Sequence, residues 1–460
     1  ATTEIYTLSL HDALPIWGHE FRAGRLWVLY RHNYAPWMGI EPHHHVEEGF
    51  GLYARCLGTD GWSELWRFSM GQGDGMQRLE TLSMADGIAA AWTTGRTDRR
   101  TNSLPRGVAL ARITTEALGP ADAAASAEPL ATAPAVAVTE PPEHPQPLEI
   151  AGRTYHLAVG DLHRHTDLSL CFVPVDGTID DAYRYAIEVA ELDFLGITDH
   201  ARDLAYGDHL SLLWHRSRKQ VTRHRLDDAF LPLVAYERSR GETDHNVISL
   251  RDDMLRPHDY PHPEFWKELD RDTFTIPHQP VNRVLWQARD DVHRPLMEIY
   301  QGFRDHSIED DAHAGLDGGH RFGFIASSDH LSTSASYACV WTPSRDTKSL
   351  FRSLQARRTF GATARIRLAV TAADHWMGEA FTSDRMPPLA IQAVGTAPIR
   401  RVDFVVDGKI VETLTPNRRE LELSHQLDLS GSHYVYGHRE QADGNRAWSS
   451  PFWIDVAQSD

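Results

Sequence analysis

Several short apolar runs in the middle of this chain end in side chains that bind metal ions. The run from Tyr155 to Leu162 is followed by His163 and His165. Later runs end in Asp199-His200, Glu237, His278 and Asp329-His330. Because these strand-like runs alternate with helical segments, we expect βα units whose strand ends meet at one edge. This pattern constrains the middle of the chain to an α/β barrel or sheet.

The residue types at these ends favour a metal site with more than one ion. Alternate side chains of an extended strand point the same way, so His163 and His165 converge on one side. Such a pair is half of a zinc site, and on its own it is weak support for one. A cluster of His, Asp and Glu without cysteine suits Zn, Mn or Fe, and the sequence does not choose among them.

Two helices are expected between these strands. Thr178 is a suitable N-cap for a helix that starts at Ile179. Its apolar face is expected to hold residues at helical spacing, namely Ala182, Tyr185, Ala186, Val189 and Ala190. A second amphipathic helix is expected from about Asp208 to Ala229.

The motifs and their order resemble the polymerase-and-histidinol-phosphatase (PHP) family of metal-dependent phosphoesterases. The matching segments are DLHRHT at 161–166, DFLGITDH at 193–200, Glu237, His245, IPHQP at 276–280 and ASSDH at 326–330. The resemblance covers about residues 155–365. It implies that residues 151–365 form a distorted (β/α)7 TIM-like barrel that holds two or three divalent ions.

The resemblance also assigns ligands. It implies that the first ion is held by four residues, namely His163, His165, Glu237 and Asp329. Glu237 would bridge to a second ion held by His245 and His278. A third ion would be held by His200, with Asp176 as its companion and His330 within reach of the cluster.

Two departures from the family pattern bear on the third ion. The family's last motif is commonly Asp-x-His, whereas here His330 directly follows Asp329. Adjacent residues at a strand end point to opposite sides unless the backbone turns. The loop after His165 is also longer than usual, so that either Asp176 or Asp167 could be the ligand, and we expect Asp176.

The cluster predicts hydrolysis of a phosphate ester on a small phosphorylated substrate. Two or three ions lower the pKa of a bound water and hold the oxygens of an in-line displacement. Metal-bound hydroxide would be the nucleophile, with Glu237 and His200 as the residues expected to act in catalysis. Arg202 and Arg238 each follow closely on an expected ligand and could contact the phosphate.

Two alternatives remain open at this point. An amidohydrolase-like hydrolase of a non-phosphate bond also begins its barrel with His-x-His, but commonly bridges its metals with a carboxylated lysine. The lysines of this chain stand away from the expected strand ends (Lys219, Lys267, Lys348 and Lys409), and Glu237 fills the bridging place. The second alternative is a non-catalytic surface binding module that uses the barrel as a scaffold.

Composition limits the class of partner. The formal net charge is −18, and no basic stripe offsets it, so strong nucleic-acid binding is not expected. No apolar run approaches the roughly 20 residues that cross a bilayer. The sequence assigns neither a compartment nor an oligomeric state.

The flanking regions have distinct compositions. Residues 1–16 are similar to a translated sequencing-adapter read-through, which would mean that the true N-terminus is missing. Residues 17–117 are β-rich and favour a partial β-propeller over a β-sandwich. Residues 118–150 are rich in Ala and Pro and are expected to be a linker. Residues 366–460 alternate apolar and polar side chains and predict a small β-sandwich.

Overall fold

The computed structural model of this chain describes residues 16–22, 25–33, 50–58, 61–63, 66–69, 79–84, 87–94, 107–114, 146–169, 176–201, 210–226, 229–239, 244–251, 264–278, 286, 290–330 and 332–457. The chain divides into two compact units, Ala1–Pro142 and Glu143–Asp460, and each is described by itself. In the part of the chain that the structure describes, every helix is too short or too polar to span a lipid bilayer.

The first unit consists of antiparallel strands in two sheets. The first sheet contains β1 (Ile16–Arg22), β2 (Arg25–Asn33), β3 (Phe50–Gly58), β4 (Gly61–Trp62) and β5 (Trp66–Ser69). The second contains β6 (Leu79–Met84), β7 (Gly87–Thr94) and β8 (Gly107–Thr114). Both sheets contribute to one buried core, with Trp27 and Leu29 from the first and Ile88 and Trp92 from the second. The propeller assignment stays a prediction.

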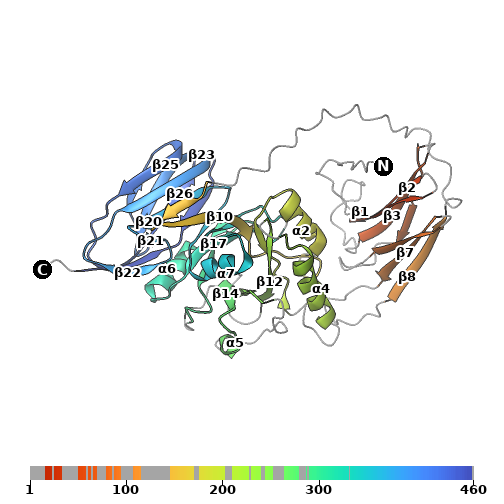
Figure 1. The fold of residues 1–460 in the computed structure, drawn as a ribbon, viewed down its shortest axis with the longest axis horizontal. Coiled ribbons are helices and arrows are strands. Elements are labelled where there is room, and N and C mark those ends of the chain that lie inside the picture. Colours follow the sequence, from red (N-terminus) through yellow and green to blue (C-terminus); the bar gives the residue numbers. More distant parts are fainter. Residues whose placement is uncertain are drawn as a thin grey trace. The chain divides into compact units, whose positions relative to one another are not determined.

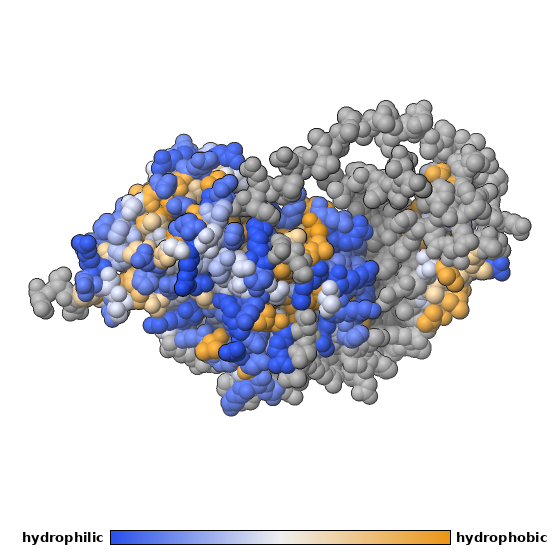
Figure 2. All heavy atoms as spheres, in the orientation of Figure 1, coloured by the Kyte–Doolittle hydropathy of each residue, from blue (hydrophilic) through white to orange (hydrophobic). Residues whose placement is uncertain are grey.

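Exposed apolar side chains of the first unit lie on β6 and β8. Leu82, Val108 and Leu110 are exposed, and Figure 2 shows apolar residues gathered over these strands. The visible face of the second unit is mostly polar in the same view. Most of the expected linker, residues 118–145, lies outside the described residues, whereas Leu148–Ile150 forms strand β9 of the second unit.

The second unit begins with alternating strands and helices (Figure 1). The elements are β9, β10 (Arg153–Asp161), α2 (Ile179–Glu188), β11 (Phe194–Gly196), α4 (Leu210–Arg223), β12 (Leu231–Arg238), β13 (His245–Ser249), α5 (Glu264–Lys267), β14 (Thr273–Pro277), β15 (Leu296–Gln301), β16 (His306–Ser307), α6 (Glu309–Asp317), β17 (Gly323–Ser327), β18 (Tyr337–Thr342), α7 (Thr347–Gln355) and β19 (Thr359–Ala362). Strands β10, β11 and β12 pair in parallel, as do β15 and β17.

The sheet is mixed, whereas the βα pattern alone predicts parallel strands. Strand β13 pairs antiparallel with both β12 and β14. The connection between β12 and β13, residues 239–244, is too short for a crossover, which needs a dozen or more residues. Strand β18 pairs antiparallel with β10 and β19. The core of this region comes from the buried sides of these strands, including Leu162, Phe194, Leu233 and Ile248.

The first expected helix is present, but its buried face differs from the prediction. Thr178 caps α2 as predicted, because its side chain accepts a hydrogen bond from the Asp181 backbone N–H. The predicted face is wrong at two positions, because Tyr185 and Val189 are exposed, and Tyr183, which was not predicted, is buried. Tyr183 stacks on His224, with ring centroids 4.6 Å apart, and this contact decides which tyrosine faces inward.

Residues after β19 form further β-sheet. The strands are β20 (Arg367–Ala372), β21 (His375–Trp376), β22 (Ala380–Ser383), β23 (Leu389–Val406), β24 (Lys409–Leu414), β25 (Arg418–His425), β26 (Gly431–Gln441), β27 (Arg446–Ser449) and β28 (Phe452–Val456). The first half of β23 pairs with β20 and β25, and its second half pairs with β24 and β26. Its register shifts after Val394, where the strand passes from one set of partners to the other.

The C-terminal strands continue the sheet of the preceding region. Strand β27 pairs with β19, which pairs with β18, and β18 pairs with β10. Trp448 on β27 is fully buried, and its Nε1 donates to Glu309 Oε1 on α6 at 2.7 Å. The Trp448 ring also stacks on Tyr300 of β15 and on His438 of β26. One packed indole therefore joins both parts of the second unit.

We expect Trp448→Ala to lower the free energy of unfolding of the second unit by about 3–5 kcal/mol, because it leaves a cavity and removes one of the hydrogen bonds to Glu309. Urea denaturation followed by circular dichroism measures this loss. Val411→Thr on β24, a half-exposed position, is the control and should change stability by less than about 0.5 kcal/mol. Equal stability of Trp448→Ala and the wild type would contradict this account of the junction.

Candidate metal centre

The expected metal ligands lie at neighbouring strand ends of the second unit. His163 and His165 follow β10, and His200 follows β11. Glu237 lies near the end of β12, His278 follows β14, and Asp329 and His330 follow β17. All of these except His200 are buried, and the His200 side chain is 16% exposed, which makes it the most accessible imidazole of the group. The structure therefore brings side chains from five strands into one buried cluster.

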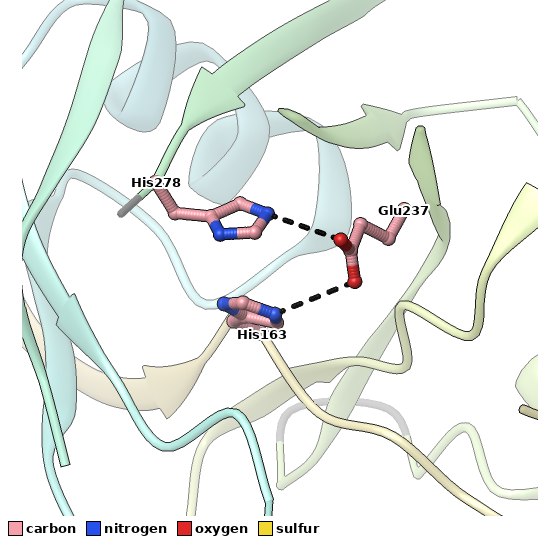
Figure 3. A group of neighbouring side chains, drawn as sticks. All are labelled: His163, Glu237 and His278. Carbon is pink, nitrogen blue, oxygen red and sulfur yellow. Dashed lines mark ion pairs between the residues drawn. The ribbon is translucent and has the colours of Figure 1, made fainter. Parts of the chain in front are cut away.

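Glu237 is at the centre of this cluster. Its Oε2 lies 2.9 Å from His165 Nε2 and 3.7 Å from His163 Nε2. The same oxygen is 3.7 Å from His200 Nε2. The other oxygen, Oε1, lies 3.5 Å from His278 Nε2, so the two oxygens face different imidazoles (Figure 3). A carboxylate in this position can bridge two cations.

Asp329 supplies a second carboxylate to the same cluster. Its Oδ1 lies 3.1 Å from His165 Nε2, 3.3 Å from His163 Nε2 and 3.3 Å from His330 Nε2. Asp329 has φ of 69°, an uncommon left-handed conformation for a residue with a side chain. This turn of the backbone is why two consecutive residues, Asp329 and His330, both reach the cluster.

Buried carboxylates hold the strand ends in place around the cluster. Asp161 Oδ1 accepts hydrogen bonds from the backbone N–H groups of His163 at 3.1 Å and Ser328 at 3.2 Å. Asp199 accepts from the Thr166 backbone N–H and hydroxyl, both at 2.7 Å. Asp199 is therefore turned toward the backbone of the loop after His165, while its neighbour His200 faces Glu237. These bonds fix the backbone that presents the ligands.

Burial and mutual charge shift the pKa values of the cluster. Burial alone would raise the pKa of Glu237, but His200, His163 and His165 lower it well below its usual range. Burial would likewise raise the pKa of Asp329, and His163 and His165 lower it. Burial would lower the pKa of His163, but Glu298 and Asp329 raise it well above its usual range. Each carboxylate is thus stabilised as an anion by the imidazoles around it.

Three groups of these residues have atoms close enough to hold a metal ion. They are His163, Glu237 and His278; His163, His165 and Asp329; and His165, His200 and Glu237, with ligand atoms within 4.8 Å of one another. Among the described residues, the buried nitrogens His163 Nε2 and His278 Nε2 make no hydrogen bond. Buried polar atoms of this kind need a partner, and a shared cation satisfies imidazole nitrogens and carboxylate oxygens at once. The residues present therefore fit divalent ions.

Other predicted site residues lie apart from these three groups or are differently engaged. His245 is buried on β13, with its ring 6.3 Å from that of Trp266. Asp176 accepts from Arg164 Nη1 at 2.9 Å and lies 2.9 Å from His330 Nδ1. Arg238 is buried at the end of β12. Arg202 lies outside the described residues.

Sequence reasoning missed Glu298 on β15. Its Oε2 lies 2.9 Å from His163 Nδ1, and both side chains are about 1% exposed. A carboxylate at Nδ1 orients the ring and presents Nε2 to a metal. Gln301 Nε2 donates to the other oxygen of Glu298 at 3.2 Å. In the sequence, the one sign of this role is a single acidic residue within the largely apolar run Leu296–Gln301, which the structure shows to be a fully buried strand.

Comparisons with known proteins give weak matches. No protein-family model matches the chain. An uncharacterized protein of Chlamydia pneumoniae is 26% identical over 129 residues, which are 24% of this chain and 21% of that protein. The chain thus spans about a fifth of the length of this curated relative.

Two solved structures are similar to parts of the chain. One is a two-domain protein from Bacteroides vulgatus described as containing a predicted PHP-like metal-dependent phosphoesterase. It is 15% identical, with a TM-score of 0.38, and the match covers 68% of this chain and 98% of that one. The other is the fibronectin(III)-like modules of Clostridium thermocellum CbhA, 22% identical with a TM-score of 0.15, covering 20% of this chain and 100% of that one. Similarities at these TM-scores assign neither a family nor a function to this chain.

Glu298→Gln should weaken metal binding about 10–100-fold, because it removes the charge that orients His163. Competition with a fluorescent chelator measures the affinity for Zn²⁺ or Mn²⁺. Glu412→Gln is the matched control, since Glu412 also lies beside an imidazole, that of His425 at 2.8 Å, outside the cluster, and its metal affinity should equal the wild type. Equal affinities for all three proteins would contradict the role of Glu298.

The metal-free protein should lose stability as the pH falls from about 6.5 to 4, in part through His278. Burial and the neighbouring His163 lower the pKa of His278 to about 4. Unfolded histidine titrates near 6.5, so the unfolded state binds the proton first, and the native state loses roughly 3 kcal/mol across this window. Urea denaturation with EDTA present, at pH 7 and pH 4.5, should show a smaller loss for His278→Asn than for the wild type.

Proposed function

We propose that this chain is a metal-dependent phosphoesterase that uses a cluster of divalent ions at the strand ends of its second unit. The observation that carries the proposal is Glu237, a buried carboxylate whose two oxygens face different imidazoles. A carboxylate that bridges two ions needs each of its oxygens to face a different set of ligands, as the oxygens of Glu237 do. Residues 151–365 are, in this proposal, a distorted barrel of the PHP type.

Two positions follow from the donor atoms. His163, His165, Glu237 and Asp329 would hold one ion. Glu237 would bridge to the other, held also by His278, with His245 on the adjacent strand β13 as its expected further ligand. Zn, Mn and Fe suit these nitrogen and oxygen donors. When bound, such ions activate water at neutral pH and stabilise the charge that develops on phosphoryl oxygens.

The protein side chains would bind and orient the substrate. His200 is the most exposed imidazole of the cluster and lies beside Glu237, so it is the group best placed to exchange a proton with a bound phosphate ester. Arg238 and Arg202 stand close in sequence to Glu237 and His200 and are proposed to contact phosphate oxygens. The substrate class is a small phosphorylated molecule.

The purified protein, supplied with Zn²⁺, Mn²⁺ or Fe²⁺, should hydrolyse phosphomonoesters or phosphodiesters, and EDTA should abolish the activity. Glu237→Gln should lower kcat/KM by more than the roughly 10–100-fold typical of losing an outer ligand contact. Glu188→Gln, an exposed exchange on α2, is the control and should keep full activity. A screen of phosphoesters beside amides and carboxylic esters measures both reaction classes.

Two outcomes would contradict the proposal. Fewer than one bound ion per chain, with no metal-dependent turnover, would favour a non-catalytic binding module. Turnover of amides or esters with phosphoesters inert would favour the amidohydrolase-like chemistry.

A further inference from the structure

A buried chain of three charged or polar side chains lies behind the proposed metal centre. Arg164 Nη1 donates to Asp176 Oδ1 at 2.9 Å, and Nη2 donates to the Asp176 backbone carbonyl at 2.7 Å. His330 Nδ1 lies 3.1 Å from Asp176 Oδ1 and 2.9 Å from Oδ2. The side chains of Arg164, Asp176 and His330 are 3%, 0% and 6% exposed. Both carboxylate oxygens of Asp176 are therefore engaged by protein groups.

This arrangement determines how His330 can act. A carboxylate beside Nδ1 accepts its proton, which leaves Nε2 as the nitrogen directed at the cluster. That Nε2 lies 3.3 Å from Asp329 Oδ1, and the ring stacks on His165 with centroids 4.5 Å apart. His330 is thus oriented toward the ion that His163, His165 and Asp329 would hold.

The same arrangement leaves a third ion without its expected ligand. A third ion would need Asp176 as a companion of His200, yet Asp176 belongs to none of the groups of described residues that could hold a metal. His200 belongs to one such group, but its other members, His165 and Glu237, are ligands assigned to the two other ions. The guanidinium of Arg164 already supplies the positive charge beside Asp176. A divalent ion placed there would meet the buried guanidinium, a group of like charge.

We infer that the centre holds two divalent ions and that the Arg164 guanidinium takes the place of a third. Asp176 is then a positioning residue for His330, and not a metal ligand. The inference rests on the proposed function, because it concerns the same cluster, and it deepens it by setting the number of ions. It also gives a role to the arginine between the two histidines of the His-x-His motif.

The test is the number of ions bound by the full chain, measured by native mass spectrometry and by elemental analysis after equilibration with excess Mn²⁺. The wild type should bind two ions. Asp176→Asn should still bind two, with an affinity about 10–100-fold weaker, because His330 is no longer oriented. Asp180→Asn, an exchange on the surface of α2, is the matched control and should bind two ions with unchanged affinity.

A third variant tests whether the Arg164 guanidinium stands in for a third ion beside Asp176. Arg164→Met should gain a third bound Mn²⁺, because it frees Asp176 from its internal cation. If this variant does not fold, the wild type and Asp176→Asn decide the question alone. Three ions in the wild type that fall to two in Asp176→Asn would overturn the inference while leaving the phosphoesterase proposal intact. A wild type without bound ions would overturn both.

Discussion

The burial of Glu237 among imidazole rings is the interaction on which the site depends. Its two oxygens face His165, His163 and His200 on one side and His278 on the other. An uncompensated buried carboxylate costs several kcal/mol, so each neighbouring strand has to deliver positive charge or a proton to this point. Divalent ions would supply that charge to several ligands at once, which protons on single rings cannot do.

The backbone around the cluster is arranged to meet this requirement. Asp161 ties the end of β10 to Ser328 after β17, and Asp199 ties the end of β11 to the loop at Thr166. Between β10 and β11 a side chain at Gly160 would collide with Phe194, so glycine permits their pairing. The left-handed turn at Asp329 adds a strained conformation that two backbone hydrogen bonds maintain, from Asp329 N–H to the His163 carbonyl and from His165 N–H to the Asp329 carbonyl.

The C-terminal strands take part in this arrangement, because the sheet is continuous. Strand β27 pairs with β19, and the pairing continues through β18 to β10, which leads into His163. Trp448 also packs on Tyr300 of β15. Glu298, two residues before Tyr300 on the same strand, is the carboxylate that contacts His163 Nδ1. The packing of the C-terminal strands is therefore connected, through β15, to the carboxylate that holds the His163 ring.

Much of the local structure followed from the sequence by itself. Short apolar runs placed His163, Glu237, His278 and Asp329 at strand ends, because alternation and strand length are local properties. Thr178 predicted the start of α2 for the same reason. The antiparallel direction of β13 departs from the βα pattern, because only six residues, 239–244, connect it to β12.

Contacts between distant segments decided the rest. Glu298 reaches His163 across 135 residues, and His330 reaches Asp176 across 154, and no spacing rule links such pairs. Tyr183 and not Tyr185 faces inward because His224 stacks on it. The sequence by itself determined which residue types stand at the strand ends. Only the tertiary structure decided which of these side chains face the centre of the cluster and which orient a neighbouring side chain. The reason is that each role depends on the partners that packing brings within hydrogen-bonding distance.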